Sequence, residues 1–340
     1  MNPHAILTSS LLAATLLAGP SIATAAEINV YTTREPALVA PLLEAFTKST
    51  GTKVNTVFLK DGLAERVSSE GESSPADILM AVDAGNLVDL VEKGVTQPVE
   101  SDILKAAVPE QLRDAAGNWF GLSMRARVLY VAKDIDLASF NYEDLADPKW
   151  KGKICIRSGQ HPYNTALFAD YIAHYGAEKT EAWLAGVKDN LARKAAGGDR
   201  DGAKDILGGI CDIAIANSYY VGLMKSGKGG EEQAQWAEAI KVVLPTFKDG
   251  GTQVNISGAA VAKHSPNKAE AVKLLEYLVS DEAQKIYAEA NFEYPVKPGA
   301  AVDPIIASFG ELKIDNKSLS EIVSHRKQAS ELVDKVGFDN

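Results

Sequence analysis

The chain has 340 residues, in which 45 Asp and Glu against 35 Lys and Arg give a formal net charge of -10. This acidic balance excludes a general nucleic-acid binder, which concentrates basic charge to neutralise phosphates. Apolar residues make up 46% and charged residues 24%, so the composition excludes the disordered and fibrous classes. Because a single core stops growing near roughly 250 to 300 residues, we expect two cores.

The first 26 residues predict a secretory signal peptide. Residues 6–18 form the apolar run ILTSSLLAATLLA, and the small residues at 23–26 offer an A-x-A cleavage site. The alternative, a buried or membrane helix, is disfavoured because the run is shorter than the ~20 residues that span a bilayer. We therefore expect residues 1–26 to be removed and the protein to be exported to the periplasm, where it is not inserted in the membrane.

The alternation of strand and helix patterns along the rest of the chain predicts an α/β fold, because helices between strands are typical of parallel sheets. Apolar spacings near 3 to 4, as at Leu38, Leu42 and Phe46, indicate the helices. Residues 267–290 predict two helices end to end, with Ser280 capping the second. The expected strands are residues 27–33, 53–59, 76–82, 127–133, 153–158, 211–217, 241–246 and 252–263.

Two segments, residues 124–133 and 251–263, have the length of strands that cross between two lobes. Two crossings build lobe 1 from both ends of the sequence and lobe 2 from its middle. We expect a cleft between the lobes, where small ligands bind. The expected division is lobe 1 at 27–125 plus 255–300, lobe 2 at 126–254, and a C-terminal helical segment at 301–340 that packs on the lobes.

The chain has two cysteines, Cys155 and Cys211, which suit an oxidising compartment if they pair. A bond between them stabilises the fold by roughly 4 kcal/mol in the chain-entropy account. The alternative, two separate buried thiols, stays open.

Three tyrosines follow these cysteines at matching distances. Tyr219 and Tyr220 come directly after the strand at 211–217, at the edge where open α/β sheets place their ligands. Tyr163 lies eight residues after Cys155, as Tyr219 lies eight after Cys211. If the cysteines are bonded, the three phenols converge on one crevice.

Converging phenols suit a hard, highly charged metal ion. A phenol with an ordinary pKa near 10 loses its proton at neutral pH only when such a cation replaces the proton. Three phenolates balance the charge of Fe3+, whereas softer metals select thiolate or imidazole ligands. The alternative for each tyrosine is packing in the core or at its rim.

Basic residues supply the other half of the predicted site. Arg34 precedes a helix that begins at Pro36, and free N–H groups at helix N-termini bind anions. Arg125 and Arg127 lie two residues apart in an expected strand. Because successive side chains of a strand point to opposite faces, these two share one face. Guanidinium groups bind carboxylate or carbonate bidentately, so a small anion that completes the metal's coordination fits them. The alternative is a set of salt bridges at the hinge.

At these residues the chain resembles the ferric-iron-binding periplasmic proteins of bacterial ABC transporters. The matching segments span nearly all of the chain after the signal: VYTTRE, SPADILMAVDAGNL, SMRARV, YEDLADPKWKGKICIRS, HPYNTAL, GGDRD, GGICDIAIANSYYVG and SPNKAEAVKLLEYLVSDEAQ. The resemblance implies an α/β, two-lobed type II periplasmic binding protein fold, each lobe a mixed, mostly parallel sheet flanked by helices. It further implies delivery of Fe3+ to a membrane permease and its ATPase. We expect a monomer that is not an enzyme.

The resemblance also assigns roles to residues. Tyr219 and Tyr220 match the family's adjacent tyrosine ligands, and Tyr163 matches the additional tyrosine of a tyrosine-rich branch. Arg34 and Arg125 fall where family members place arginines near the metal or its anion. The sequence departs from the family at Glu35-Pro36, where many relatives carry His or Tyr ligands. Glu35, or an exogenous carbonate, citrate or water, is therefore expected to replace the ligand from lobe 1.

Two other functions stay open. A binder of an organic or inorganic anion would use the arginines as main contacts and the tyrosines as walls. A periplasmic metalloenzyme would turn over a substrate, although the chain has no G-x-S-x-G, P-loop or H-E-x-x-H motif.

Overall fold

The computed structural model describes residues 26–340, so the predicted signal peptide lies outside the described residues except for its last position. All of the predicted strands are present, although the segment at 153–158 is extended over two residues only before the chain turns into a helix. The strands are β1 (Glu27–Thr32), β2 (Lys53–Phe58), β3 (Ile78–Ala81), β4 (Thr96–Gln97), β5 (Phe120–Ala132), β6 (Ile154–Cys155), β7 (Ile213–Asn217), β8 (Ile240–Val243), β9 (Val254–Ala262) and β10 (Tyr294–Pro295).

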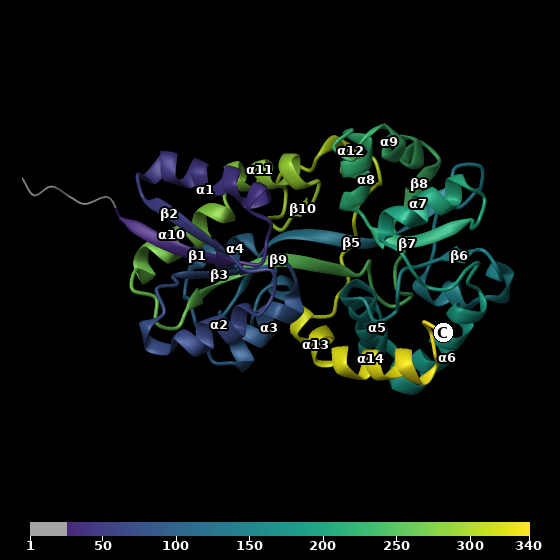
Figure 1. Ribbon diagram of the computed structural model, residues 1–340, viewed down its shortest axis with the longest axis horizontal. Helices are drawn as coiled ribbons and strands as arrows, with labels where there is room; N and C mark the ends of the chain where they lie inside the picture. Colours follow the sequence, from purple (N-terminus) through teal and green to yellow (C-terminus); the bar gives the residue numbers. More distant parts are fainter. Residues whose placement is uncertain (1–25) are drawn as a thin grey trace, which may run out of the picture.

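Helices cover the sheet along its length (Figure 1). They are α1 (Pro36–Thr50), α2 (Leu63–Glu70), α3 (Ala84–Glu92), α4 (Asp102–Ala107), α5 (Pro162–Tyr175), α6 (Ala177–Asp189), α7 (Asp199–Leu207), α8 (Tyr219–Lys225), α9 (Glu231–Glu238), α10 (Lys268–Leu278), α11 (Asp281–Asn291), α12 (Pro304–Ala307), α13 (Leu319–Ser324) and α14 (Arg326–Lys335).

Local sequence signals set several of these helix boundaries. Proline at the first helical position costs no hydrogen bond there, and α1 begins at Pro36 as predicted. The predicted pair of helices breaks at Ser280, whose Oγ accepts a hydrogen bond from the Ala283 N–H at 3.3 Å. The apolar residues Leu42 and Phe46 of α1 are buried, so the periodicity correctly identified the face that packs on the sheet.

The strands follow the order β2-β1-β3-β9-β5-β7-β6. The outer strands pair in parallel, β1 with β2 and β3, and β6 with β7. The central strands β5 and β9 pair antiparallel with each other, and each pairs antiparallel with its other neighbours. The α/β class and the mixed sheet are thus confirmed, whereas the expected parallel majority is wrong because both long strands run against their neighbours.

The two long strands connect two groups of elements (Figure 1). Residues 120–126 of β5 pair with β9, and residues 127–131 pair with β7. The change of partner between Ala126 and Arg127 supports the division into lobe 1 and lobe 2, which we keep as a proposal.

The last helices lie against both groups. Helix α13 packs against α3 and α5, and α14 packs against α5 and α6. The buried Phe338 closes this segment against Phe168 of α5, with ring centroids 5.6 Å apart. The C-terminal segment is therefore bound to α5 by packing.

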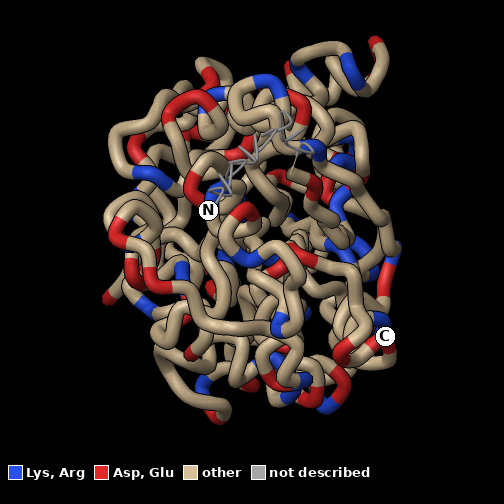
Figure 2. The backbone as a smooth tube through the Cα atoms, turned by 90° about the vertical axis from the view of Figure 1, so that its left-hand side faces the viewer, with Lys and Arg blue, Asp and Glu red and all other residues tan. Residues whose placement is uncertain are grey.

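Acidic and basic positions are interspersed over the backbone in the view of Figure 2. That pattern fits a solvated surface with modest net acidic charge. Among residues 26–340, no helix is long and apolar enough to cross a membrane.

Candidate functional site

The end of β7 positions Tyr219 and Tyr220. Ser218 follows the strand, donates its N–H to the Ala126 carbonyl at 3.0 Å, and accepts the Ala126 N–H on its Oγ at 3.1 Å. Helix α8 then begins at Tyr219, and the two tyrosine rings lie 4.1 Å apart with an interplanar angle of 33°. The strand has therefore ended before the tyrosines, as their convergence requires.

A disulfide joins Cys155 and Cys211, with Cα atoms 5.9 Å apart, so the predicted pairing is confirmed. The bond connects the segments that lead to the two tyrosines. Tyr163, in the first turn of α5, lies with its hydroxyl oxygen 3.5 Å from that of Tyr219. The structure thus brings Tyr163 and Tyr219 together.

His161 fixes the start of α5. Its Nδ1 accepts a hydrogen bond from the Tyr163 N–H at 3.2 Å, and its ring meets the Tyr163 ring edge-on at 4.5 Å. Burial, reinforced by the Arg157 charge, lowers the pKa of His161 to about 4. A neutral imidazole is what the acceptor role of Nδ1 requires, so His161 acts as a cap that orients Tyr163.

A cavity of about 200 Å³ lies in front of the tyrosines. Its lining includes Arg34, Glu35 and Arg125 on one side and Tyr163 and Tyr219 on the other. The predicted lobes thus both contribute to it. Tyr220 is not among the lining residues; its ring packs against that of Tyr219, with the Arg200 guanidinium 5.5 Å from its centroid.

Arg34 is engaged by protein partners that the sequence did not indicate. Its Nη1 donates to Ser257 Oγ at 2.6 Å and to Glu293 Oε1 at 3.0 Å, and Glu293 also bonds the Ser123 hydroxyl. The pair is almost fully buried, and Glu293 itself lines the cavity. Arg34 therefore forms a salt bridge with Glu293, which is the alternative interpretation of the basic residues.

Arg125 uses only part of its hydrogen-bonding capacity. Its Nη2 donates to the Val82 carbonyl at 2.5 Å and lies 3.5 Å from Asp83 Oδ2. Its Nε and Nη1 are buried and make no hydrogen bond within the described part of the chain. Buried, unpaired donors are costly, so this guanidinium retains unused hydrogen-bonding capacity beside the cavity.

Three guanidinium groups surround the Tyr163 ring. Arg157, Arg125 and Arg127 lie 5.2, 5.5 and 6.0 Å from its centroid. Arg127 and Arg157 are both held by the buried Asp199, at 2.6 and 3.2 Å. Arg125 and Arg127 share one side of the strand as predicted, but Arg127 serves to support Tyr163 rather than to line the cavity.

The surroundings of Tyr219 and Tyr220 favour the neutral form of these two phenols. Burial, followed by the neighbouring Tyr163 and Tyr220, raises the pKa of Tyr219 well above its ordinary value. Burial and Tyr163 likewise raise the pKa of Tyr220. Only a strongly charged cation that replaces the protons would ionise such a pair at neutral pH.

Glu35 places a carboxylate beside the cavity, next to Arg34. Glu35 is exposed, precedes α1 and lines the cavity, while Pro36 begins the helix and has no ligand atom.

Two groups of α/β elements, joined by long strands and sharing a polar cavity, define a two-lobed ligand-binding protein of the periplasmic binding protein fold. The chain belongs to the family of bacterial extracellular solute-binding proteins, whose model matches residues 73–308.

Similar proteins share this arrangement over nearly the whole chain. The iron uptake protein A1 of Synechocystis is 41% identical over 92% of this chain and 87% of its own. A solved Bordetella ferric binding protein is 67% identical, with a TM-score of 0.90 over 92% of this chain and 100% of its own. A Trichodesmium protein in complex with iron and citrate ligands is 42% identical, with a TM-score of 0.87 over 92% and 99%. These relatives are named for binding and uptake.

Proposed function

We propose that the protein captures ferric iron in the cavity between its lobes and delivers it to the permease and ATPase of an ABC importer. The observation that carries the proposal is the meeting of the Tyr163 and Tyr219 hydroxyls, 3.5 Å apart, in a cavity that both lobes line. Two oxygens bound to one metal at about 2 Å each lie within 4 Å of one another, so this separation suits shared ligation.

The phenolates of Tyr163, Tyr219 and Tyr220 are the proposed ligands. Together they carry three negative charges, which balance Fe3+ without leaving net charge in the half-buried site. Tyr220 packs against Tyr219, with ring centroids 4.1 Å apart, and is the proposed source of the third phenolate.

A synergistic anion completes the proposed coordination. Arg125 lines the cavity and keeps guanidinium donors without a partner among residues 26–340, so it suits a carbonate or a citrate carboxylate, and citrate accompanies iron in the Trichodesmium neighbour. Glu35 is the protein's own candidate on the lobe 1 side.

Lobe closure is the proposed mechanism of delivery. A ligand that bridges residues of both lobes favours the state in which they approach, and the permease would recognise that state. We propose that the protein works as a periplasmic monomer that binds and releases its ligand without catalysing a reaction.

A competition assay against a ferric chelator tests the ligands. Tyr219→Phe and Tyr220→Phe should each lower ferric affinity by more than the 10- to 100-fold typical of losing an outer-shell partner. The matched control is Tyr171→Phe, on the same helix as Tyr163 but stacked on Trp183 at 4.1 Å, which should leave affinity unchanged. Unchanged affinity in both site variants, with folding intact, would refute the proposal.

The unpaired donors of Arg125 also favour a second candidate, a binder of small anions alone. Tight binding of citrate or carbonate to the metal-stripped protein, together with no uptake of Fe3+, would select this function instead.

A further inference from the structure

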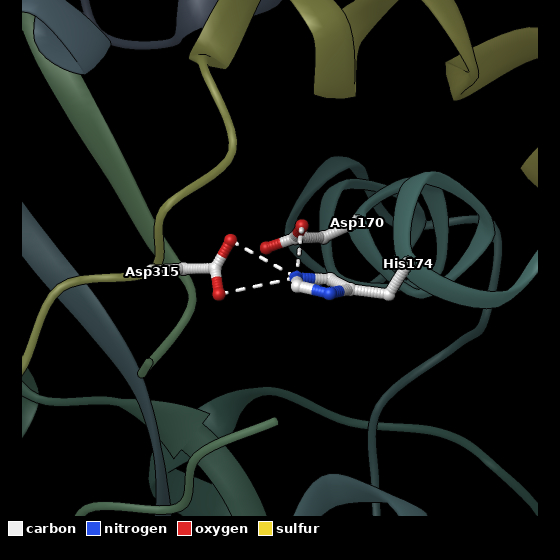
Figure 3. Close-up of side chains that lie close together, drawn as sticks. All are labelled: Asp170, His174 and Asp315. Carbon is white, nitrogen blue, oxygen red and sulfur yellow. Dashed lines mark hydrogen bonds and ion pairs between the residues drawn. The ribbon is translucent and has the colours of Figure 1, made fainter. Parts of the chain in front are cut away.

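A second cluster of ligating side chains lies at the other end of α5. Asp170 and His174 stand one turn apart on this helix, and Asp315 approaches them from the segment between α12 and α13 (Figure 3). His174 Nε2 lies 3.1 Å from both Asp315 oxygens and 3.7 Å from Asp170 Oδ1. One ligand atom from each residue falls within 4.8 Å of the others.

The Asp170 carboxylate lacks donors. It is fully buried, and neither oxygen makes a hydrogen bond within residues 26–340. In Figure 3 it points at the same ring nitrogen that Asp315 faces. A buried carboxylate without donors is very costly, whereas a bound cation removes the cost.

The surroundings orient the other two groups. The second ring nitrogen of His174, Nδ1, lies 3.0 Å from Asp249 Oδ1. A carboxylate on the far nitrogen is the usual support of a metal-bound histidine, because it turns the lone pair of Nε2 toward the metal. Asp315 accepts the N–H groups of Gly251 and Lys317 at 2.8 and 2.9 Å, which fix its carboxylate.

We propose that Asp170, His174 and Asp315 bind a divalent cation, with Zn2+ the best fit. Zn2+ takes imidazole and carboxylate ligands at about 2.0 to 2.2 Å in a tetrahedron, which places the ligand atoms about 3.3 to 3.6 Å apart. The distances of 3.1 and 3.7 Å bracket this range. Two carboxylates balance the charge of the ion, and a water completes the four ligands.

This site is separate from the tyrosine cavity. Tyr163 occupies the first turn of α5 and His174 the last, so roughly 16 Å of helix at 1.5 Å per residue lies between them. The cation would connect α5 to the segment before α13 and thereby fasten the C-terminal helices to the body of the protein.

Glycines keep the neighbouring loop close to the cluster. A Cβ atom at Gly250 would lie 2.1 Å from Asp315 Oδ1 and 2.9 Å from His174 Cε1. A Cβ atom at Gly251 would lie 2.4 Å from the backbone of Ile314. The loop can approach Asp315 this closely only without side chains at these two positions.

Calorimetric titration of Zn2+ into the untagged, metal-stripped protein tests the proposal. We expect one equivalent to bind and to raise the melting temperature. Asp170→Asn and His174→Gln should abolish binding, and Asp249→Asn should weaken it 10- to 100-fold. The control Glu238→Gln removes an exposed carboxylate and should change nothing.

Two further variants keep the test decisive. Asp315 lies in a connecting segment, so Asp315→Asn does not alter a helix. This variant should abolish Zn2+ binding, and it keeps the test available if a substitution on α5 prevents folding. Tyr219→Phe should bind Zn2+ normally, because the tyrosines belong to the other site. The proposal is overturned if the folded protein takes up no Zn2+, or if uptake is lost in Tyr219→Phe but kept in Asp170→Asn and Asp315→Asn.

Discussion

Removing the carboxylate of Asp199 should destabilise the protein by about 3 to 5 kcal/mol, the usual cost of breaking a buried ion pair. In the folded protein Asp199 accepts from Arg127 Nη1 at 2.6 Å, from Arg157 Nη1 at 3.2 Å and from the Asn217 N–H at 2.8 Å. Arg127 is 1% exposed, so Asp199→Ala leaves its charge in the interior with no opposite charge beside it. Because domains of this kind are stable by about 5 to 15 kcal/mol, the loss is a large fraction of the total.

Urea unfolding measures this effect as a shift in midpoint at constant slope. The matched control is Glu238→Gln, which breaks an exposed pair with Lys133 and should cost less than about 1 kcal/mol. The two guanidinium groups beside the Tyr163 ring also lose their position, so Asp199→Ala should lower ferric affinity as well. If Asp199→Ala costs no more than Glu238→Gln, the buried network does not have the role given to it.

Three further predictions concern the disulfide, Arg125 and the tyrosines. Replacing Cys155 and Cys211 together by alanine should lower the free energy of unfolding by about 4 kcal/mol, because the disulfide closes a loop with a sequence separation of 56. An unchanged melting temperature in thermal unfolding would contradict this. Arg125→Gln should remove the dependence of ferric affinity on carbonate or citrate, and affinity measured with and without the anion checks it. Because the pKa values of Tyr219 and Tyr220 are raised, iron binding must release their protons, so ferric affinity should rise with pH between 6 and 8, and a flat profile would count against phenolate ligation.

The sequence predicted those features that depend on local pattern. Apolar periodicity located α1, and a capping serine located the break between α10 and α11. The equal offsets from Cys155 and Cys211 anticipated the approach of Tyr163 to Tyr219, because the disulfide brings the two preceding segments together.

Partners far apart in the chain were not predictable. Arg34 and Glu293 are 259 residues apart, and nothing in either segment marks the other as its partner. Asp199 gave no signal beyond its place at the start of a helix, since its role comes from the arginines that surround it. The same holds for Asp315, 141 residues from His174. The antiparallel direction of the long strands was also not predictable from local sequence patterns, because it depends on how these strands cross between the lobes.

Iron ligation by the tyrosines can be followed by visible absorption while the metal-stripped protein is titrated with a chelated ferric salt. We expect a broad phenolate-to-iron charge-transfer band that saturates at one equivalent and is lost or strongly reduced in Tyr219→Phe. A folded protein that develops no such band would contradict it, and would leave the tyrosines as walls of a cavity that serves another ligand.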